Sequence, residues 1–555
     1  MANIPSRWGR TPAVHTIGAV TLAVAAFLEL FAWAKFPFEG YDSFSHIYWI
    51  AEWHKLWQFG IYYPRWLPDS FHGFGAPSFY YYPPLPFFLS SVLYGILPNF
   101  SADDIGKILG LCAFLFSFFS MRLYLGWRAK AMSVPSRSSI ITAASLLYAF
   151  APYRIFNYAT RGALPEHMAF GLVPFVFWGL DLCMRKNTRS GSAMLVLSLA
   201  LLILTNMPAA AVAGIGIVLY VLVQKKPVRG RGFSWLLLSS IGSLLVTAFY
   251  LVPIGAMFGD VQMERLWRPV PLVQSSPFLA IFTGEALTIN SYTFVMLVGA
   301  CVLFFGWLRS GNRSQPFFWI IAFIIVAQLP VLTQYLYRFV PPFTIVQLAS
   351  RFSILLILVT AIAWQDELGP TITRSSLVSI VVLFWSVCTI GLVSLQLADI
   401  HFHKHGPLPI SDAPEYATRW AKPYYEWGDS LATPFVNHSQ NIVWPAKDSA
   451  SVISSIRTPY SDTIDYMARV PSQAVVRRSY WPSWKATVDG KIVATAPDSL
   501  GRITLTVPEG KHELILNLET SHAAETGSWV SLCSLIALII GWIVSRKSKS
   551  SKSSA

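Results

Sequence analysis

The sequence predicts a polytopic α-helical membrane protein of about 12 spans with a small β-sandwich before the last span. Of its 555 residues, 54% are hydrophobic and only 13% are charged, whereas soluble domains average about 25% charged residues. Apolar runs long enough to cross a hydrocarbon layer of about 30 Å recur along most of the chain. Short runs rich in β-branched residues, separated by turn signals, gather near the C-terminus.

The apolar runs give the candidate spans directly. One further apolar segment, Leu85–Leu97, is too short to cross and suits an interfacial or re-entrant helix. The candidate spans are 12–34, 105–127, 138–152, 166–184, 192–207, 210–224, 234–256, 290–308, 316–330, 347–366, 375–397 and 526–545.

Basic residues orient these spans. The formal charge is +14, and Lys and Arg cluster in short loops between apolar runs, the first beginning at Arg128. With the N-terminus inside, every strongly basic short loop falls on one side, as the positive-inside rule requires. We therefore expect a multi-pass protein of the cell (inner) membrane with both termini cytoplasmic. The positive charge serves orientation, and we expect no nucleic-acid partner.

This topology divides the chain into parts. Residues 1–397 form the expected transmembrane domain, with a long first external loop at 35–104. An extracytoplasmic linker region is expected at 398–470 and an extracytoplasmic β domain at 471–525. The final span, 526–545, leads into a basic, low-complexity tail at 546–555, which is typical of a disordered cytoplasmic end.

The β domain is predicted from short runs and from the hairpin signal Asp489-Gly490. Pro508-Glu509-Gly510 is a second turn signal. The predicted strands are Ala474–Ser479, Lys485–Val488, Ile492–Thr495, Arg502–Val507 and Glu513–Leu518.

The first external loop carries the strongest candidates for chemistry. If 42–58 is helical, Asp42, His46 and Trp49 share one face. Asp42 and His46 could take a proton from a hydroxyl or hold a divalent cation. The competing interpretation makes Asp42 an N-cap of an interfacial helix and the Trp residues an aromatic belt.

Later loops add further charged groups. Glu166 starts a span, and Arg161, just before it, could bind a phosphate. A Glu at a helix N-terminus is also favourable through the helix dipole alone. Ser101 and Asp104 are spaced for a helix cap rather than for a paired-acid site.

Arg351 lies four residues after Gln347, about a turn inside an apolar run. An ionisable residue at such a place is a functional candidate by default, and the alternative is a side chain that snorkels to the interface. Asn206 sits in a polar hairpin between two spans.

Several motifs are missing from the sequence. We find no Walker loop, no G-x-G-x-x-G at a strand–helix junction, no G-x-S-x-G elbow and no H-E-x-x-H. ATP-driven transport, dinucleotide chemistry, serine hydrolysis and zincin chemistry therefore have no support.

The external loops resemble a known family. The chain is similar to bacterial membrane proteins called "6-pyruvoyl-tetrahydropterin synthase-related", which are related to the YfhO-like glycosyltransferases of the GT-C superfamily. The segment after Tyr480 resembles the YfhO-like extracytoplasmic β domain. The resembling motifs are Asp42-x3-His46, Tyr63-Pro64-Arg65-Trp66, Gly73-Phe74-Gly75-x-Pro77, Tyr158-x2-Arg161-Gly162-x3-Glu166, Pro341-Pro342, Gln347-x3-Arg351 and Tyr480-Trp481-Pro482-x-Trp484.

The resemblance implies a GT-C-like fold and transfer of a sugar from a polyprenyl-phosphate donor to an extracytoplasmic acceptor, a cell-surface glycan, lipid or protein. Asp42 corresponds to the GT-C acid of the first external loop and would act as base. A divalent cation stays open, with Asp42 and Glu166 as its ligands, although Tyr41 stands where some GT-C branches carry a second acid. The remaining implied site residues are His46 and Glu166 as catalytic groups, Arg65, Arg161, Arg351 and Gln347 at the donor phosphate, and Trp49, Tyr80, Tyr81, Tyr82 and Asn206 in contact with substrate or lipid.

Two other functions compete with the enzyme. A transporter or flippase of lipid-linked saccharides predicts buried charges near mid-membrane along a path between spans. A non-catalytic assembly protein of the same fold predicts that the site charges are lost. The candidate charges are present and gather at the outer ends of the spans, which favours the enzyme.

Overall fold

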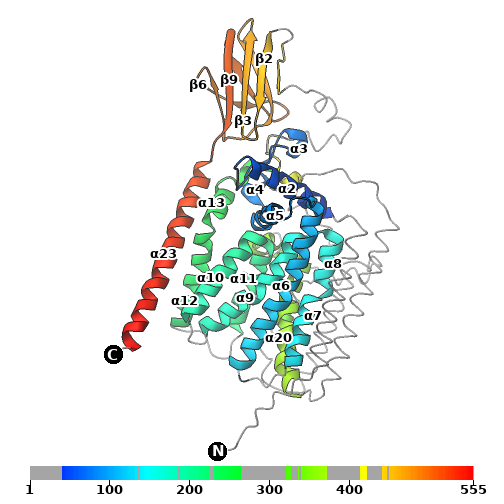
Figure 1. Ribbon diagram of the computed structural model, residues 1–555, viewed down its shortest axis with the longest axis vertical. Helices are drawn as coiled ribbons and strands as arrows, with labels where there is room; N and C mark the ends of the chain where they lie inside the picture. The colour runs from blue at the N-terminus through cyan, green and yellow to red at the C-terminus, as the bar shows by residue number, and fades with distance from the viewer. Residues whose placement is uncertain are drawn as a thin grey trace, which may run out of the picture. The chain divides into compact units, whose positions relative to one another are not determined.

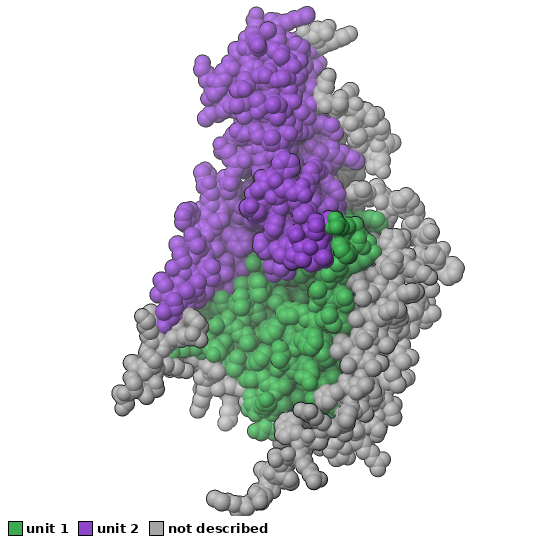
Figure 2. All heavy atoms as spheres, in the orientation of Figure 1, with its two compact units in different colours: residues 1–47, 99–240, 269–407 green, residues 48–98, 241–268, 408–555 purple. Residues whose placement is uncertain are grey.

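The chain is mostly helical, with a sheet domain followed by one long C-terminal helix (Figure 1). The computed structural model describes residues 41–131, 133, 138–184, 188–223, 231–263, 320–324, 326, 335–336, 339–371, 413–421, 441–446 and 449–553. The spans expected at 12–34, 290–308 and 375–397, and most of 316–330, lie outside these residues. Two compact units can be distinguished (Figure 2). Unit 1 comprises 1–47, 99–240 and 269–407, and unit 2 comprises 48–98, 241–268 and 408–555.

Unit 1 is a bundle of apolar helices. Its helices are α6 (Ala102–Ala131), α7 (Ser138–Ala149), α8 (Pro152–Arg161), α9 (Leu164–Met184), α10 (Thr188–Thr205), α11 (Met207–Leu222), α19 (Pro341–Val346) and α20 (Ser353–Thr371), together with the first part of α12 (Arg231–Val246). Helix α9 packs against α6 and α10, and α7 packs against α6 and α20. The expected cap at the start of α6 is confirmed, because Ser101 and Asp104 bond each other's side chains and backbone amides.

Long apolar helices support a membrane protein. Among the described residues, three helices are long and apolar enough to cross a membrane: Ala102–Ala131, Leu164–Met184 and His522–Gly541. The expected span 234–256 is a bent pair, Gly232–Val246 and Ala248–Ala256, which meet at 73°. Four further apolar helices of the described part have 10–17 residues: Leu85–Ile96, which was expected not to cross, Ser138–Ala149, Arg189–Thr205 and Met207–Leu222. The count of twelve spans and their orientation remain predictions.

A buried charge cluster joins four helices of unit 1, α6, α9, α11 and α20. Arg128 of α6 donates to Asp181 of α9 at 3.0 Å and to Asp366 of α20 at 2.8 Å. The hydroxyls of Tyr124 and Tyr220 donate to Asp181. Arg128 was expected in a cytoplasmic loop, but it lies inside α6 and is buried. Its charge therefore serves packing, since buried ions need partners.

Unit 2 holds most of the segment expected as the first external loop, together with residues 241–268 and 408–555. Its helices are the second part of α2 (Tyr41–Gln58), α3 (Ser70–Gly73), α4 (Ser78–Tyr81), α5 (Leu85–Ile96), α13 (Ala248–Ala256) and α23 (His522–Ser553). Helices α13 and α23 pack closely at Gly527. A Cβ at this position would lie 2.5 Å from the Ala248 carbonyl oxygen, so a larger residue would not fit. Helix α23 continues through most of the tail that composition predicts to be disordered. Extending a formed helix avoids the cost of nucleation.

The C-terminal strands form two antiparallel sheets. The sheet orders are β1-β4-β8-β7 and β2-β3-β9-β5-β6. All five predicted strands are present, and Asp489 and Gly490 both adopt positive φ in the β5–β6 turn. The strands are β1 (Ile442–Val443), β2 (Ala450–Arg457), β3 (Ser461–Ala468), β4 (Ser472–Ser479), β5 (Trp484–Val488), β6 (Lys491–Val493), β7 (Ala496–Pro497), β8 (Arg502–Val507) and β9 (Gly510–Leu518).

The expected linker at 398–470 is wrong in its last part. Strands β2 and β3 pair with each other, and β3 pairs with β9, so the sheet domain includes residues before 471. Strand β2 is an edge strand exposed along most of its length. It therefore lacks the alternation of apolar and polar residues that marks a half-buried strand.

A single buried carboxylate joins the two sheets. Asp462 of β3 accepts two hydrogen bonds from Arg478 of β4, each 3.0 Å long. It also accepts from Arg457 at 2.9 Å. Asp462 and Arg478 are both almost fully buried, so each compensates the charge of the other.

We expect Asp462→Asn to destabilise unit 2 by about 3–5 kcal/mol, because it strands the buried Arg478 guanidinium without an anion. Asp465→Asn is the matched control, since half-buried Asp465 on the same strand accepts a hydrogen bond from the Ser454 hydroxyl and does not contact Arg478. Thermal unfolding of the purified full-length protein, followed by tryptophan fluorescence, measures the difference. Equal unfolding temperatures for the two variants would contradict this role of Asp462.

Candidate functional site

Two polar residues of α2 contact the end of α8. Asp42 and His46 lie one turn apart on α2. Arg161 Nη2 donates to Asp42 Oδ2 at 2.7 Å, and His46 Nδ1 donates to the Gly162 carbonyl at 2.9 Å. Asp42 and His46, on one face of α2, thus bond two consecutive residues at the C-terminal end of α8. His46 positions this junction, and its Nδ1 proton is committed to the backbone.

Gly162 makes this junction geometrically feasible. It ends α8 with a φ of 69°, a left-handed conformation that favours glycine. The turn brings the last side chain of α8, Arg161, near the first turn of α9, where Glu166 lies. No helix was expected between the candidate spans 138–152 and 166–184, but most of this segment is helix α8.

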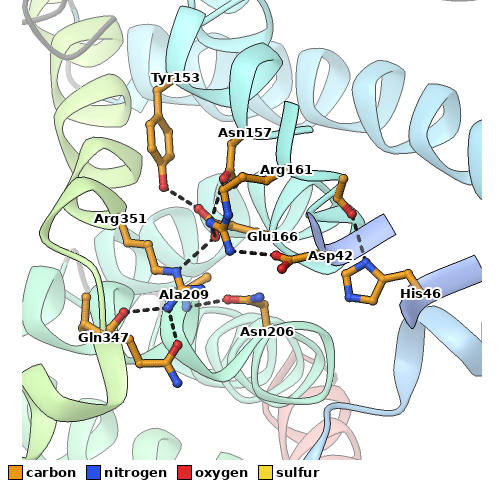
Figure 3. Close-up of polar contacts among 12 residues, drawn as sticks. Asp42, His46, Tyr153, Asn157, Arg161, Glu166, Asn206, Ala209, Gln347 and Arg351 are labelled. Atoms are coloured by element: carbon orange, nitrogen blue, oxygen red, sulfur yellow. Dashed lines mark hydrogen bonds and ion pairs between the residues drawn. The ribbon is translucent and has the colours of Figure 1, made fainter. Parts of the chain in front are cut away.

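Glu166 is the centre of the site. Its side chain is only 1% exposed, and a buried carboxylate needs compensation. Tyr153 donates its hydroxyl to Oε1 at 2.6 Å, and Arg351 Nε donates to Oε2 at 3.1 Å. Arg161 Nη1 lies 3.7 Å from Oε2. Charged groups therefore alternate from Arg351 through Glu166 and Arg161 to Asp42 (Figure 3).

Arg351 is held by the turn that precedes it. Its Nη1 donates to the Val346 carbonyl at 2.8 Å and to Gln347 Oε1 at 2.7 Å. Gln347 has a φ of 64° and a ψ of −52°, and the Leu348 amide bonds the Val346 carbonyl across it. This tight γ-turn is strained for a residue with a side chain. The Arg351 side chain is 8% exposed, so the snorkelling alternative is wrong.

Exposure falls steeply across the site. The side chain of Asp42 is 38% exposed and that of Arg161 is 18% exposed. Glu166 and Arg351 are nearly closed to solvent. Asp42 is therefore the member of this group that an outside molecule can reach first.

The sequence did not identify two residues of the site. Tyr153 bonds Glu166, and Asn157 Oδ1 accepts from Arg161 Nη1 at 2.8 Å. Tyr153, Asn157 and Arg161 recur every four residues on α8, so they lie on one helical face. This four-residue spacing could have identified Tyr153 and Asn157 from the sequence, but no helix was expected in this segment.

The site does not fit a divalent cation. Among the described residues, no group of three or more His, Cys, Asp and Glu side chains could hold a metal. Asp42 and Glu166, the expected ligands, each contact a guanidinium instead. A cation between them would meet the positive charge of Arg161.

Asn206 has a structural contact. Its side-chain oxygen accepts from the Ala209 amide at 2.8 Å and so caps α11. This bond accounts for the polar residue in the predicted hairpin between spans.

The remaining predicted residues belong to unit 2, where most of them are buried. Trp49, Tyr80 and Tyr81 are at most 4% exposed, so the aromatic faces expected for a sugar or lipid are covered. Trp49 packs edge-on against the rings of Phe79, Tyr82, Phe87 and Tyr416. Burying large rings is strongly favourable.

Arg65 is engaged within the same unit. Its Nη2 donates to the Phe249 carbonyl at 3.1 Å, and its guanidinium lies 4.4 Å from the centre of the Tyr63 ring. A backbone bond and a cation–π contact explain this arginine without a phosphate.

Burial and neighbours set the charges at the α2–α8 junction. Burial lowers the pKa of His46 below its usual value of 6.5, although the Asp42 carboxylate opposes this. The imidazole is therefore neutral at pH 7. Burial by itself would lower the pKa of Arg161, but Asp42 and Glu166 raise it overall, and the guanidinium stays charged.

This pKa of His46 predicts a pH dependence of stability. In the unfolded chain His46 is protonated near pH 6.5, whereas in the folded chain its protonation requires a lower pH. The contribution of neutral His46 to the free energy of unfolding is therefore complete above pH 6.5 and is lost as the pH falls below that value. Unfolding temperatures at pH 5 and pH 7.5 should differ more for wild type than for His46→Asn, whose amide can still donate to Gly162. Identical pH profiles would contradict the assignment.

Comparisons with known proteins give a likeness to solved structures alone. No protein-family model and no curated protein matches the chain. Among solved structures, it is similar to the arabinofuranosyltransferase AftD from mycobacteria, with 17% identity, a TM-score of 0.44, and coverage of 71% of this chain and 27% of that chain. A mutant of the same enzyme gives 16% identity, a TM-score of 0.44, and coverage of 70% and 28%. The chain thus spans little more than a quarter of AftD, and the activity in that name is a property of AftD.

Proposed function

We propose that the chain is a membrane glycosyltransferase that moves a sugar from a polyprenyl-phosphate donor to an extracytoplasmic acceptor. One observation carries this proposal: an accessible carboxylate, Asp42, stands at the end of a charge chain whose two guanidiniums are fixed by a buried carboxylate. Such an arrangement combines a candidate base with preorganised positive charge.

The proposed step needs both kinds of group. The acceptor hydroxyl oxygen bonds to the anomeric carbon while the bond from that carbon to the phosphate oxygen breaks. The hydroxyl proton goes to Asp42, and the electron pair of the broken bond stays on the lipid phosphate. Arg161 and Arg351 stabilise this growing charge, because guanidiniums suit phosphate oxygens in geometry and remain protonated.

Glu166 has a different role from Asp42 in this proposal. Its two oxygens already accept from Tyr153 and Arg351, and Arg161 lies beside it. A carboxylate so occupied is a poor candidate for proton transfer. Glu166 therefore acts as the counter-ion that orients both arginines.

The transporter alternative requires buried charges that line a path. In the described part of unit 1, the other buried ion cluster is that of Arg128, Asp181 and Asp366. These side chains bond one another between α6, α9 and α20, so they stabilise the packing of the helices and do not line a path. This observation favours the enzyme over the transporter.

We expect Asp42→Asn to lower the rate of transfer at least about 100-fold, because a positioned base contributes that much or more. The assay supplies a panel of polyprenyl-phosphate sugars to purified protein and measures loss of sugar from the lipid. Asp103→Asn is the control, since Asp103 pairs with Lys107 on α6, away from the candidate site. Full activity in folded Asp42→Asn would refute the assignment, and lipid movement without transfer would favour the transporter.

A further inference from the structure

The arrangement of charges also determines which contact an incoming phosphate can break. The site holds two carboxylates, Asp42 and Glu166, and two guanidiniums, Arg161 and Arg351. Their charges sum to zero. Each guanidinium already faces a carboxylate, so its full positive charge becomes available to a phosphate when that carboxylate leaves it.

The two ion pairs differ in what their separation costs. Glu166 is 1% exposed and is held also by Tyr153, so separating it from Arg351 would leave a buried, uncompensated charge. Asp42 is 38% exposed and is joined to Arg161 through one hydrogen bond. A separated Asp42 carboxylate regains water, and Arg161 keeps Glu166 as a nearby counter-charge. The Asp42–Arg161 pair is the one that opens.

Other contacts hold the Arg161 side chain in place when its partner at Nη2 changes from Asp42 to phosphate. Asn157 and Glu166 hold Arg161 through Nη1, whereas Asp42 uses Nη2. Nη2 can therefore change partner while the rest of the side chain stays in place. The bond from His46 to Gly162 keeps α2 against α8, so Asp42 remains nearby after it is released.

We propose that Arg161 holds Asp42 as an ion pair until a lipid phosphate takes its place. The donor phosphate then binds Arg161 Nη2, and the freed Asp42 oxygen becomes available to accept the proton of the acceptor hydroxyl. Donor binding precedes activation of the acceptor. This inference rests on the proposed function for its sequence of steps, but the competition between Asp42 and phosphate for Arg161 is a binding property.

Binding of unglycosylated polyprenyl phosphate to the purified full-length chain in nanodiscs tests this competition. Asp42→Asn removes the competitor, so we expect affinity to rise about three- to tenfold, the effect of restoring a binding-competent state that was a minority. Arg161→Gln should weaken binding. In the Arg161→Gln background, Asp42→Asn should have no further effect.

The controls separate competition from a general change of charge. Asp103→Asn removes one negative charge elsewhere in unit 1 and should leave affinity unchanged. If Arg161→Gln does not fold, Arg161→Lys replaces it, because one ammonium cannot hold Asn157 and phosphate as the guanidinium does. The thermal unfolding of every variant is checked.

The inference is overturned if wild type does not bind polyprenyl phosphate, if Asp42→Asn leaves affinity unchanged or lowers it, or if the gain persists without Arg161. Because the measurement needs no turnover, it is distinct from the test of the proposed function. If the single and double variants bind polyprenyl phosphate as expected but the wild-type protein transfers no sugar, the competition for Arg161 stands and the proposed activity is wrong.

Discussion

The buried carboxylate of Glu166 is the constraint on which the site depends. A charge closed to water must be compensated by close partners, and Glu166 has Tyr153, Arg351 and Arg161. These partners come from α8 and from the turn before α20. Glu166 holds the guanidiniums of Arg161 and Arg351 close together. Such a fixed pair of positive charges is suited to stabilising a phosphate.

Two unusual backbone conformations deliver these partners. Gly162 turns the chain between α8 and α9, so that Arg161 and Glu166 can meet. Gln347 accepts a strained φ of 64° and presents both its side chain and the Val346 carbonyl to Arg351. Strain of this kind costs on the order of 1–3 kcal/mol and persists where surrounding contacts fix it.

The same electrostatic rule appears elsewhere in the chain with a different outcome. Arg128 with Asp181 and Asp366, and Asp462 with Arg457 and Arg478, are also buried ion clusters. Both clusters join neighbouring elements, and their carboxylates are buried, although Arg457 is 23% exposed. The site differs from them because one of its carboxylates, Asp42, reaches solvent. Accessibility, rather than the presence of buried charge, separates the candidate site from the packing clusters.

The sequence by itself determined apolar helices, five of the strands and most of the charged residues of the site. Those features depend on local periodicity and on charge at the ends of apolar runs. It missed β2, an edge strand exposed along its length, and β3, whose buried face begins with the carboxylate of Asp462. It also missed Tyr153 and Asn157, whose roles depend on the direction of α8. Only the tertiary structure decided that Trp49 is buried while Asp42 is accessible, and which carboxylate meets which guanidinium. Ion pairing depends on distances between residues such as Asp42, Arg161 and Arg351, which packing sets and sequence separation does not.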